Sequence, residues 1–129
     1  MVPIVEPEIL LDGEHGIERT FEVAQKVWAE VFYYMAENNV MFEGILLKPS
    51  MVTPGAECKD RATPEQVAEY TLKLLHRRIP PAVPGIMASF SSTFTHSFTS
   101  LAIIVKHVLI MDYCLSSFCL VGNPRLKQT

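Results

Sequence analysis

The sequence predicts an α/β fold in which parallel strands alternate with helices, as in a parallel sheet or a segment of a barrel. Short apolar runs begin near Val2, Val40 and Ala82, and strands of parallel sheets are apolar through most of their length. Residues with helical spacing separate these runs. Because parallel neighbours need a long crossover connection, the order strand, helix, strand, helix, strand indicates successive βα units.

The composition is that of one globular domain. The chain has 129 residues, 49% of them apolar and 19% charged, with a formal net charge of −3. Binding of nucleic acid phosphates needs a clustered basic surface, and a net negative charge gives no reason to expect one. We therefore do not expect a nucleic acid partner. The three cysteines lack the spacing of a zinc site or a disulfide framework, which favours a reducing compartment. No secretory signal or transit peptide is recognised at the start. The cysteines are Cys58, Cys114 and Cys119.

The first expected strand lies within Val2–Leu10 as a buried strand with a polar end, and a turn at Asp12-Gly13 follows it. The next segment has apolar residues at alternating steps of four and three, which predicts a helix with one buried face. Asn38-Asn39 ends that helix. The predicted face comprises Ile17, Phe21, Ala24, Trp28, Val31 and Met35.

The second expected strand combines the apolar runs 40–42 and 45–47. It ends at Lys48-Pro49, because proline cannot donate a hydrogen bond to a neighbouring strand. A loop is expected over residues 50–61. The third apolar run opens at residue 82.

The second helix is predicted by its start signal. Thr63 is an expected N-cap, with Pro64 at the first helical position and Gln66 completing a capping box. The helix ends before Ile79, because prolines follow. The basic residues 76–78 then complement the helix dipole. The apolar face comprises Val67, Tyr70, Thr71, Leu74 and Leu75.

The last third of the chain has a different character. Residues 88–100 are rich in serine and threonine, and residues 101–121 are apolar but interrupted by Lys106, His107 and Asp112. Eleven apolar side chains contribute about −5 kcal/mol to membrane insertion, and the two charges cancel it at about +3 kcal/mol each. A membrane span is therefore not expected. An open alternative is a non-catalytic product in which 101–121 inserts into a membrane or binds a partner.

Lys48 is the first residue that indicates chemistry. A lysine at the carboxyl end of an apolar strand loses hydration, which favours the neutral amine that attacks carbonyl groups. In barrels, catalytic groups lie at the carboxyl ends of strands. The structural alternative is a lysine whose stem lies along the strand while its ammonium reaches solvent.

Glu6 and Glu8 strengthen the chemical interpretation. Their spacing of two residues on a strand places both carboxylates on one face. Two carboxylates that lie close together favour retention of a proton on one of them, which suits a group that donates and accepts protons. If this strand neighbours that of Lys48, an amine and a proton shuttle meet. The structural alternative is a pair of solvated carboxylates before a turn.

Residues 40–50, VMFEGILLKPS, resemble the active-site signature of class I fructose-bisphosphate aldolases throughout, and residues 2–10, VPIVEPEIL, resemble the preceding strand of that family. The resemblance runs without a gap from Val2 to Met87 and is strongest to the plant plastid form. The complete match over the signature disfavours another lysine-dependent aldolase or a transaldolase.

The resemblance implies part of a (β/α)8 TIM barrel, with strands five, six and the start of seven. It implies cleavage of fructose 1,6-bisphosphate to dihydroxyacetone phosphate and glyceraldehyde 3-phosphate, in glycolysis or the Calvin cycle, without a cofactor or metal. Lys48 would form the Schiff base, Glu6 would act as acid and base, and Glu8 would tune the lysine's surroundings. A homotetramer in the plastid stroma is also implied, with the cytoplasm as the alternative.

The sequence departs from the family after the third apolar run. Residues 88–91 read Ala-Ser-Phe-Ser where the family has a Ser-Gly-Gly phosphate cradle. The family's catalytic aspartate, its phosphate-binding arginine and its C-terminal tyrosine segment have no counterpart. We therefore expect a barrel segment over residues 1–87, an unrelated tail over 88–129 that is not a domain, and no cleavage by this chain alone.

Overall fold

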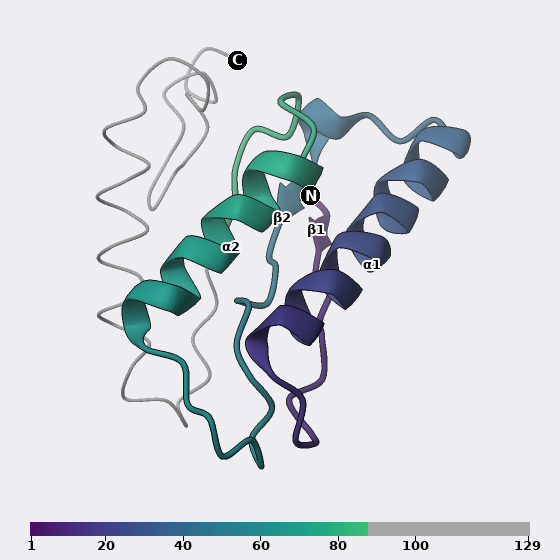
Figure 1. The fold of residues 1–129 in the computed structure, drawn as a ribbon. Helices are drawn as coiled ribbons and strands as arrows, with labels where there is room; N and C mark the ends of the chain where they lie inside the picture. The colour runs from purple at the N-terminus through teal and green to yellow at the C-terminus, as the bar shows by residue number, and fades with distance from the viewer. Residues whose placement is uncertain (88–129) are drawn as a thin grey trace.

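Residues 1–87 are described by a computed structural model of the chain. Figure 1 shows two helices side by side, with two short strands behind them. Neither helix has the length and apolarity needed to cross a bilayer. The expectations for residues 88–129, including the apolar stretch 101–121, lie outside the described residues. The elements in chain order are β1 (Ile4–Val5), α1 (Ile17–Glu37), the 3-10 helix η1 (Phe42–Gly44), β2 (Leu46–Leu47) and α2 (Pro64–Arg78).

Strands β1 and β2 are parallel neighbours. Ile4 lies opposite Leu46, and Val5 lies opposite Leu47. A third extended segment joins the other side of β2 through a parallel bridge between Leu47 and Ile86. The predicted order of parallel βα units is therefore confirmed, and β2 is the central strand of the described part.

Two predictions about the strands are wrong. The run 40–42 was expected to be strand, yet η1 begins at Phe42, because Asn39 leaves α1 with a φ of 55° and the next residues turn before β2 begins. The first strand was expected to be buried, yet Ile4 is 51% exposed. Of the described elements, the two helices cover only one face of the strands, so alternate residues stay uncovered.

Helix α1 buries most of its predicted face. Trp28 is fully buried, and the helix ends where the Asn38 side chain donates to the Tyr34 carbonyl at 2.8 Å. The prediction missed Phe32, which is buried and packs edge-on against Phe42 with ring centroids 5.7 Å apart. Phe32, four residues after Trp28, therefore takes the buried position that was predicted for Val31. Val31 lies three residues after Trp28 and is half-buried.

Helix α2 begins at the predicted cap. The Gln66 amide donates to Thr63 Oγ1 at 3.3 Å, and the Thr63 amide donates to Gln66 Oε1 at 2.9 Å. These reciprocal bonds satisfy two of the amides that a helix start leaves without partners. Pro64 occupies the first turn, and basic residues fill the last turn, as predicted.

The hydrophobic core lies between the helices and one face of the strands. Ile45 and Leu47 of the β2 strand region belong to it and are 2% and 0% exposed. Val5 and Ile9 of the first strand pack against the same core. Because strand side chains alternate between faces, the even-numbered residues of both strands point the other way. We call that side, defined by residues 4, 6, 8, 46, 48 and 50, the open face.

Candidate active site

Lys48 and Glu6 meet on the open face. The register of β1 and β2, continued by one residue, places Glu6 opposite Lys48. The Lys48 amide donates to the Val5 carbonyl at 2.7 Å. Lys48 Nζ then lies 2.6 Å from Glu6 Oε1, with the lysine side chain 30% exposed and the glutamate side chain 50% exposed. The structure thus brings together two of the three predicted site residues.

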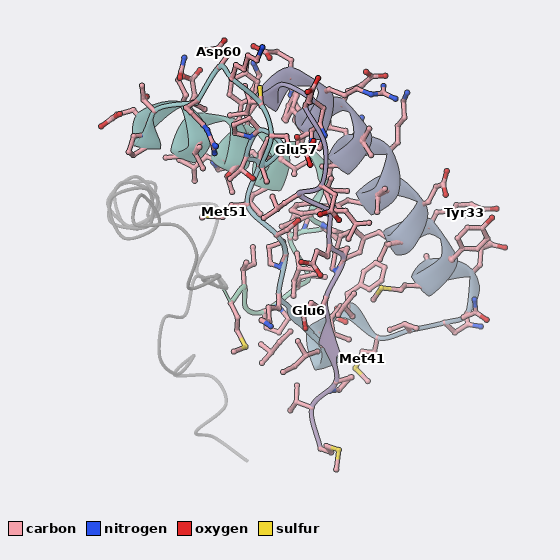
Figure 2. The ribbon with its side chains drawn as sticks, turned by 90° about the horizontal axis from the view of Figure 1, so that it is seen from below. Glu6, Tyr33, Met41, Met51, Glu57 and Asp60 are labelled. Atoms are coloured by element: carbon pink, nitrogen blue, oxygen red, sulfur yellow. The ribbon has the colours of Figure 1, made fainter. Side chains whose placement is uncertain are left out.

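Parallel pairing explains why these two side chains meet. Paired residues of neighbouring strands project to the same face, and the strand spacing of about 4.8 Å lets a lysine reach a carboxylate. Pro49 follows Lys48 and has no backbone donor, so the next amide of this segment is that of Ser50. Figure 2 shows Glu6 beside the β1 ribbon, with Met41 toward one end of the strands and Glu57 toward the other.

Glu8 is placed differently from Glu6. It is exposed and follows Glu6 by two residues toward the carboxyl end of the first strand. Within residues 1–87, no hydrogen bond or ion pair joins Glu8 to Lys48. The residue level with Glu8 in the ladder is Ser50, since the Ser50 amide donates to the Pro7 carbonyl at 3.3 Å. Lys48 therefore has one carboxylate partner in the described part of the chain.

The loops that follow the two strands are tied to each other. The Gly55 amide donates to the His15 carbonyl at 2.8 Å, and the Ala56 amide donates to the Leu11 carbonyl at 2.7 Å. A Cβ on Gly55 would lie 2.2 Å from the Gly13 oxygen, so only glycine allows this approach. The loop after Glu8 and the loop after Lys48 thus form one unit at the carboxyl end of the sheet.

Two buried threonines hold the segment after Lys48 from the helix side. Thr20 of α1 donates its hydroxyl to the Thr53 carbonyl at 2.7 Å. Thr71 of α2 accepts the Val52 amide at 3.0 Å. Both threonines are at most 3% exposed. The sequence predicted the burial of Thr71, but neither of these bonds, because a hydroxyl on an apolar helical face gives no sign of its partner.

No metal centre is evident in the part of the chain that the structure describes, where no three His, Cys, Asp or Glu side chains are grouped to hold an ion. The site consists of an amine and a carboxylate at the carboxyl end of adjacent parallel strands. Such a pair can form a covalent imine with a carbonyl substrate and move the protons that this reaction requires.

A family model described as fructose-bisphosphate aldolase class-I matches residues 1–109. The chain belongs to this family. It is 93% identical over 87 residues to the chloroplastic fructose-bisphosphate aldolase of Oryza sativa subsp. japonica, a match that covers 67% of this chain and 22% of that protein. It is 84% identical over 87 residues to the chloroplastic fructose-bisphosphate aldolase 1 of Arabidopsis thaliana, covering 67% of this chain and 22% of that protein. The predicted identity of the family is therefore confirmed.

A solved structure also resembles this aldolase chain. It is fructose-bisphosphate aldolase from Plasmodium falciparum in complex with TRAP and a small-molecule inhibitor. The TM-score is 0.78 at 44% sequence identity, and the match covers 84% of this chain and 31% of that one. The chain spans about a quarter of the length of the curated relatives it matches. The predicted division after residue 87 stays a prediction.

Proposed function

We propose that the protein to which these residues belong cleaves fructose 1,6-bisphosphate to dihydroxyacetone phosphate and glyceraldehyde 3-phosphate, with Lys48 as the Schiff-base nucleophile. The observation that carries the proposal is the 2.6 Å contact between Lys48 Nζ and Glu6 Oε1 in a chain of the class I aldolase family. Relatives with the aldolase name share up to 93% identity with residues of this chain.

The proposed roles follow from what imine chemistry requires. Lys48 Nζ attacks the substrate carbonyl after giving up a proton, and Glu6 is the nearest described group that can take it. The resulting carbinolamine loses water only when its hydroxyl receives a proton, which Glu6 then donates. As a base takes the proton of the substrate hydroxyl, the protonated imine accepts the electron pair of the breaking carbon-carbon bond, so that the aldehyde leaves and an enamine stays on Lys48. Protonation of the enamine carbon and hydrolysis by water then release dihydroxyacetone phosphate and the free amine.

Glu8 has a supporting role in this proposal. It lies on the same face as Glu6, one ladder step further toward the carboxyl end. Its negative charge contributes to the electrostatic surroundings in which Lys48 and Glu6 react. We assign it no covalent step, because no described contact joins it to the amine.

The finer fold is part of the same proposal. We assign β1, β2 and the segment at Ile86 to strands five, six and the start of seven of a (β/α)8 barrel. Their parallel order and the likeness to the Plasmodium falciparum enzyme support this assignment. The open face would then line the barrel interior. The chloroplastic names of the relatives support a plastid location, and the homotetramer rests on the family alone.

For the 129-residue chain by itself we expect imine formation without cleavage. Binding of a bisphosphate requires cations or clustered amides around each phosphate. Residues 88–91 read Ala-Ser-Phe-Ser where the resemblance implies a Ser-Gly-Gly phosphate cradle. Substrate phosphates would therefore be held poorly beside the reacting carbon.

Borohydride trapping with dihydroxyacetone phosphate tests the assignment of Lys48. We expect the reduced adduct to concentrate on Lys48 rather than on Lys26, Lys59 or Lys73, when peptides are mapped by mass spectrometry. Lys48→Ala should remove it, and Glu6→Gln should slow its formation while leaving its position unchanged. The rice relative serves as the positive control for trapping. An adduct of equal yield in Lys48→Ala, or an even spread over the lysines, would overturn the proposal.

A further inference from the structure

The ladder between the two catalytic strand ends is interrupted by prolines. The amides of Leu46, Lys48 and Ser50 donate in turn to the carbonyls of the first strand, from Pro3 to Pro7. In a parallel ladder the first strand should also donate in return. Pro7 lacks the amide that would bind the Lys48 carbonyl. The strand ends are thus joined more weakly where the candidate site lies.

Ser50 supplies a replacement for the missing bonds. The next donor of the first strand is the Ile9 amide, and it binds Ser50 Oγ at 3.1 Å. A side-chain hydroxyl here accepts an amide where a regular ladder uses a backbone carbonyl. Ile9 directly follows Glu8, and Ser50 follows Lys48 by two residues. The bond therefore links the carboxylate-bearing strand end to the lysine-bearing one.

Ser50 itself is held from the opposite side. Val52, two residues later, donates its amide to Thr71 Oγ1 on α2 at 3.0 Å, and the Thr53 carbonyl accepts the Thr20 hydroxyl at 2.7 Å. Because both threonines are buried in the helix layer, the segment after Lys48 has a fixed place on that side. Through its bond to the Ile9 amide, the Ser50 hydroxyl restrains the end of the first strand relative to this segment.

We propose that Ser50 is a positioning residue that keeps Glu6 and Glu8 in register with Lys48. The hydroxyl acts through the Ile9 amide and takes part in no step of the reaction. The geometric part of this inference stands on the structure alone, and only its consequence for catalysis rests on the proposed function. Removal of the hydroxyl should free the end of the first strand and loosen the contact between Glu6 and Lys48.

Competitive labelling of lysines on the whole 129-residue chain tests the inference. Formaldehyde with cyanoborohydride methylates amines, and the yield on Lys48 is compared with that on Lys26 and Lys73 in the same molecules. Because the Glu6 carboxylate lies 2.6 Å from Lys48 Nζ and shields that side of the amine from the reagent, Ser50→Ala should raise the relative labelling of Lys48 by roughly threefold. Ser50→Thr keeps the hydroxyl and should match the unsubstituted chain.

Thr71→Val is the matched control for a merely structural effect. It removes one of the two helix-side hydroxyl bonds of the segment while the Thr20 bond remains, so it should lower stability and leave the labelling ratio of Lys48 unchanged. An unchanged ratio in a folded Ser50→Ala chain overturns the inference, and so does an equal rise in Thr71→Val.

Amide hydrogen exchange of the unsubstituted chain tests the inference even if Ser50→Ala does not fold. The Ile9 amide should exchange with solvent at least about tenfold more slowly than the Glu8 amide, since only the former has an acceptor in the described residues. Equal exchange rates overturn the inference. If the labelling ratio responds to Ser50→Ala while no variant traps dihydroxyacetone phosphate, the proposed function fails and the positioning role of Ser50 stands.

Discussion

The two faces of the β1–β2 sheet differ in what lies against them. Leu47 and Lys48 are adjacent in the chain, yet Leu47 is fully buried beneath the helices and the Lys48 side chain is 30% exposed on the open face. Ile45 shares the buried side, and Glu6 shares the open side. One residue step along a strand therefore separates two environments with different physical roles.

The covered face carries more of the stability than the open face. Truncation of a buried leucine to alanine typically costs about 2–5 kcal/mol. An exposed ion pair contributes about 0.2–1 kcal/mol. The pair of Lys48 and Glu6 thus adds little to folding, and its proposed role is in catalysis. The helix-covered face stabilises the strands that hold the pair in place.

The largest expected effect is on the covered face. Trp28→Ala should lower the free energy of unfolding by about 3–5 kcal/mol, because it empties the centre of the core between α1 and the strands. Urea denaturation followed by circular dichroism measures the loss. Tyr33→Ala, at a position 58% exposed on the same helix, should change the free energy by less than about 0.5 kcal/mol. Similar losses in both variants would contradict the division between faces.

The second effect concerns the loops that join the two strand ends. Gly55→Ala should cost about 1–3 kcal/mol, because the new methyl would meet the Gly13 oxygen and the two loops would have to separate. Gly44→Ala is the control, since a Cβ there has no neighbour within 4 Å. Thermal unfolding of both chains measures the difference. A Gly55→Ala chain as stable as Gly44→Ala would show that the loops are not in close contact.

The smallest effect lies on the outer surface of α1, away from both faces. Hydrogen bonds from Lys26, and next from Arg19, lower the pKa of Glu22 below its ordinary value of 4.5. A depressed carboxyl pKa stabilises the fold above the unfolded value and loses this contribution as pH falls through the folded value. Glu22→Gln should therefore unfold slightly earlier at neutral pH, and the gap should close on acidification below pH 4.5. Melting curves across that range measure it; a constant gap would contradict the assignment.

The helices could be predicted from the sequence because their signals are local. The repeat around Trp28 and the capping box at Thr63 depend on neighbours within one or two turns. The lengths of the strands could not be predicted in the same way, because each strand pairs with a partner about 40 residues away. Pro7 and Pro49 also remove backbone donors, and the effect of this on the sheet is seen only once the pairing is known. Phe42 was expected in a strand because apolar runs look alike in strands and short helical turns.

The candidate site was only partly predictable. Spacing placed Glu6 and Glu8 on one face, and a strand end and the family signature singled out Lys48. The contact between Lys48 and Glu6, however, depends on the register of two strands. The roles of Ser50 and Thr20 depend on hydroxyl bonds to distant backbone groups. Such bonds leave no periodic pattern in the sequence, so nothing in it distinguishes these two residues from other serines and threonines.

The free energies of unfolding of Lys48→Met and Leu47→Ala test the division between the two faces most directly. Both chains are measured by urea denaturation under the same conditions. We expect Lys48→Met to change the free energy of unfolding by less than about 1 kcal/mol and Leu47→Ala to lower it by about 2–5 kcal/mol. A loss in Lys48→Met as large as that in Leu47→Ala would contradict the claim that the open face contributes little to stability.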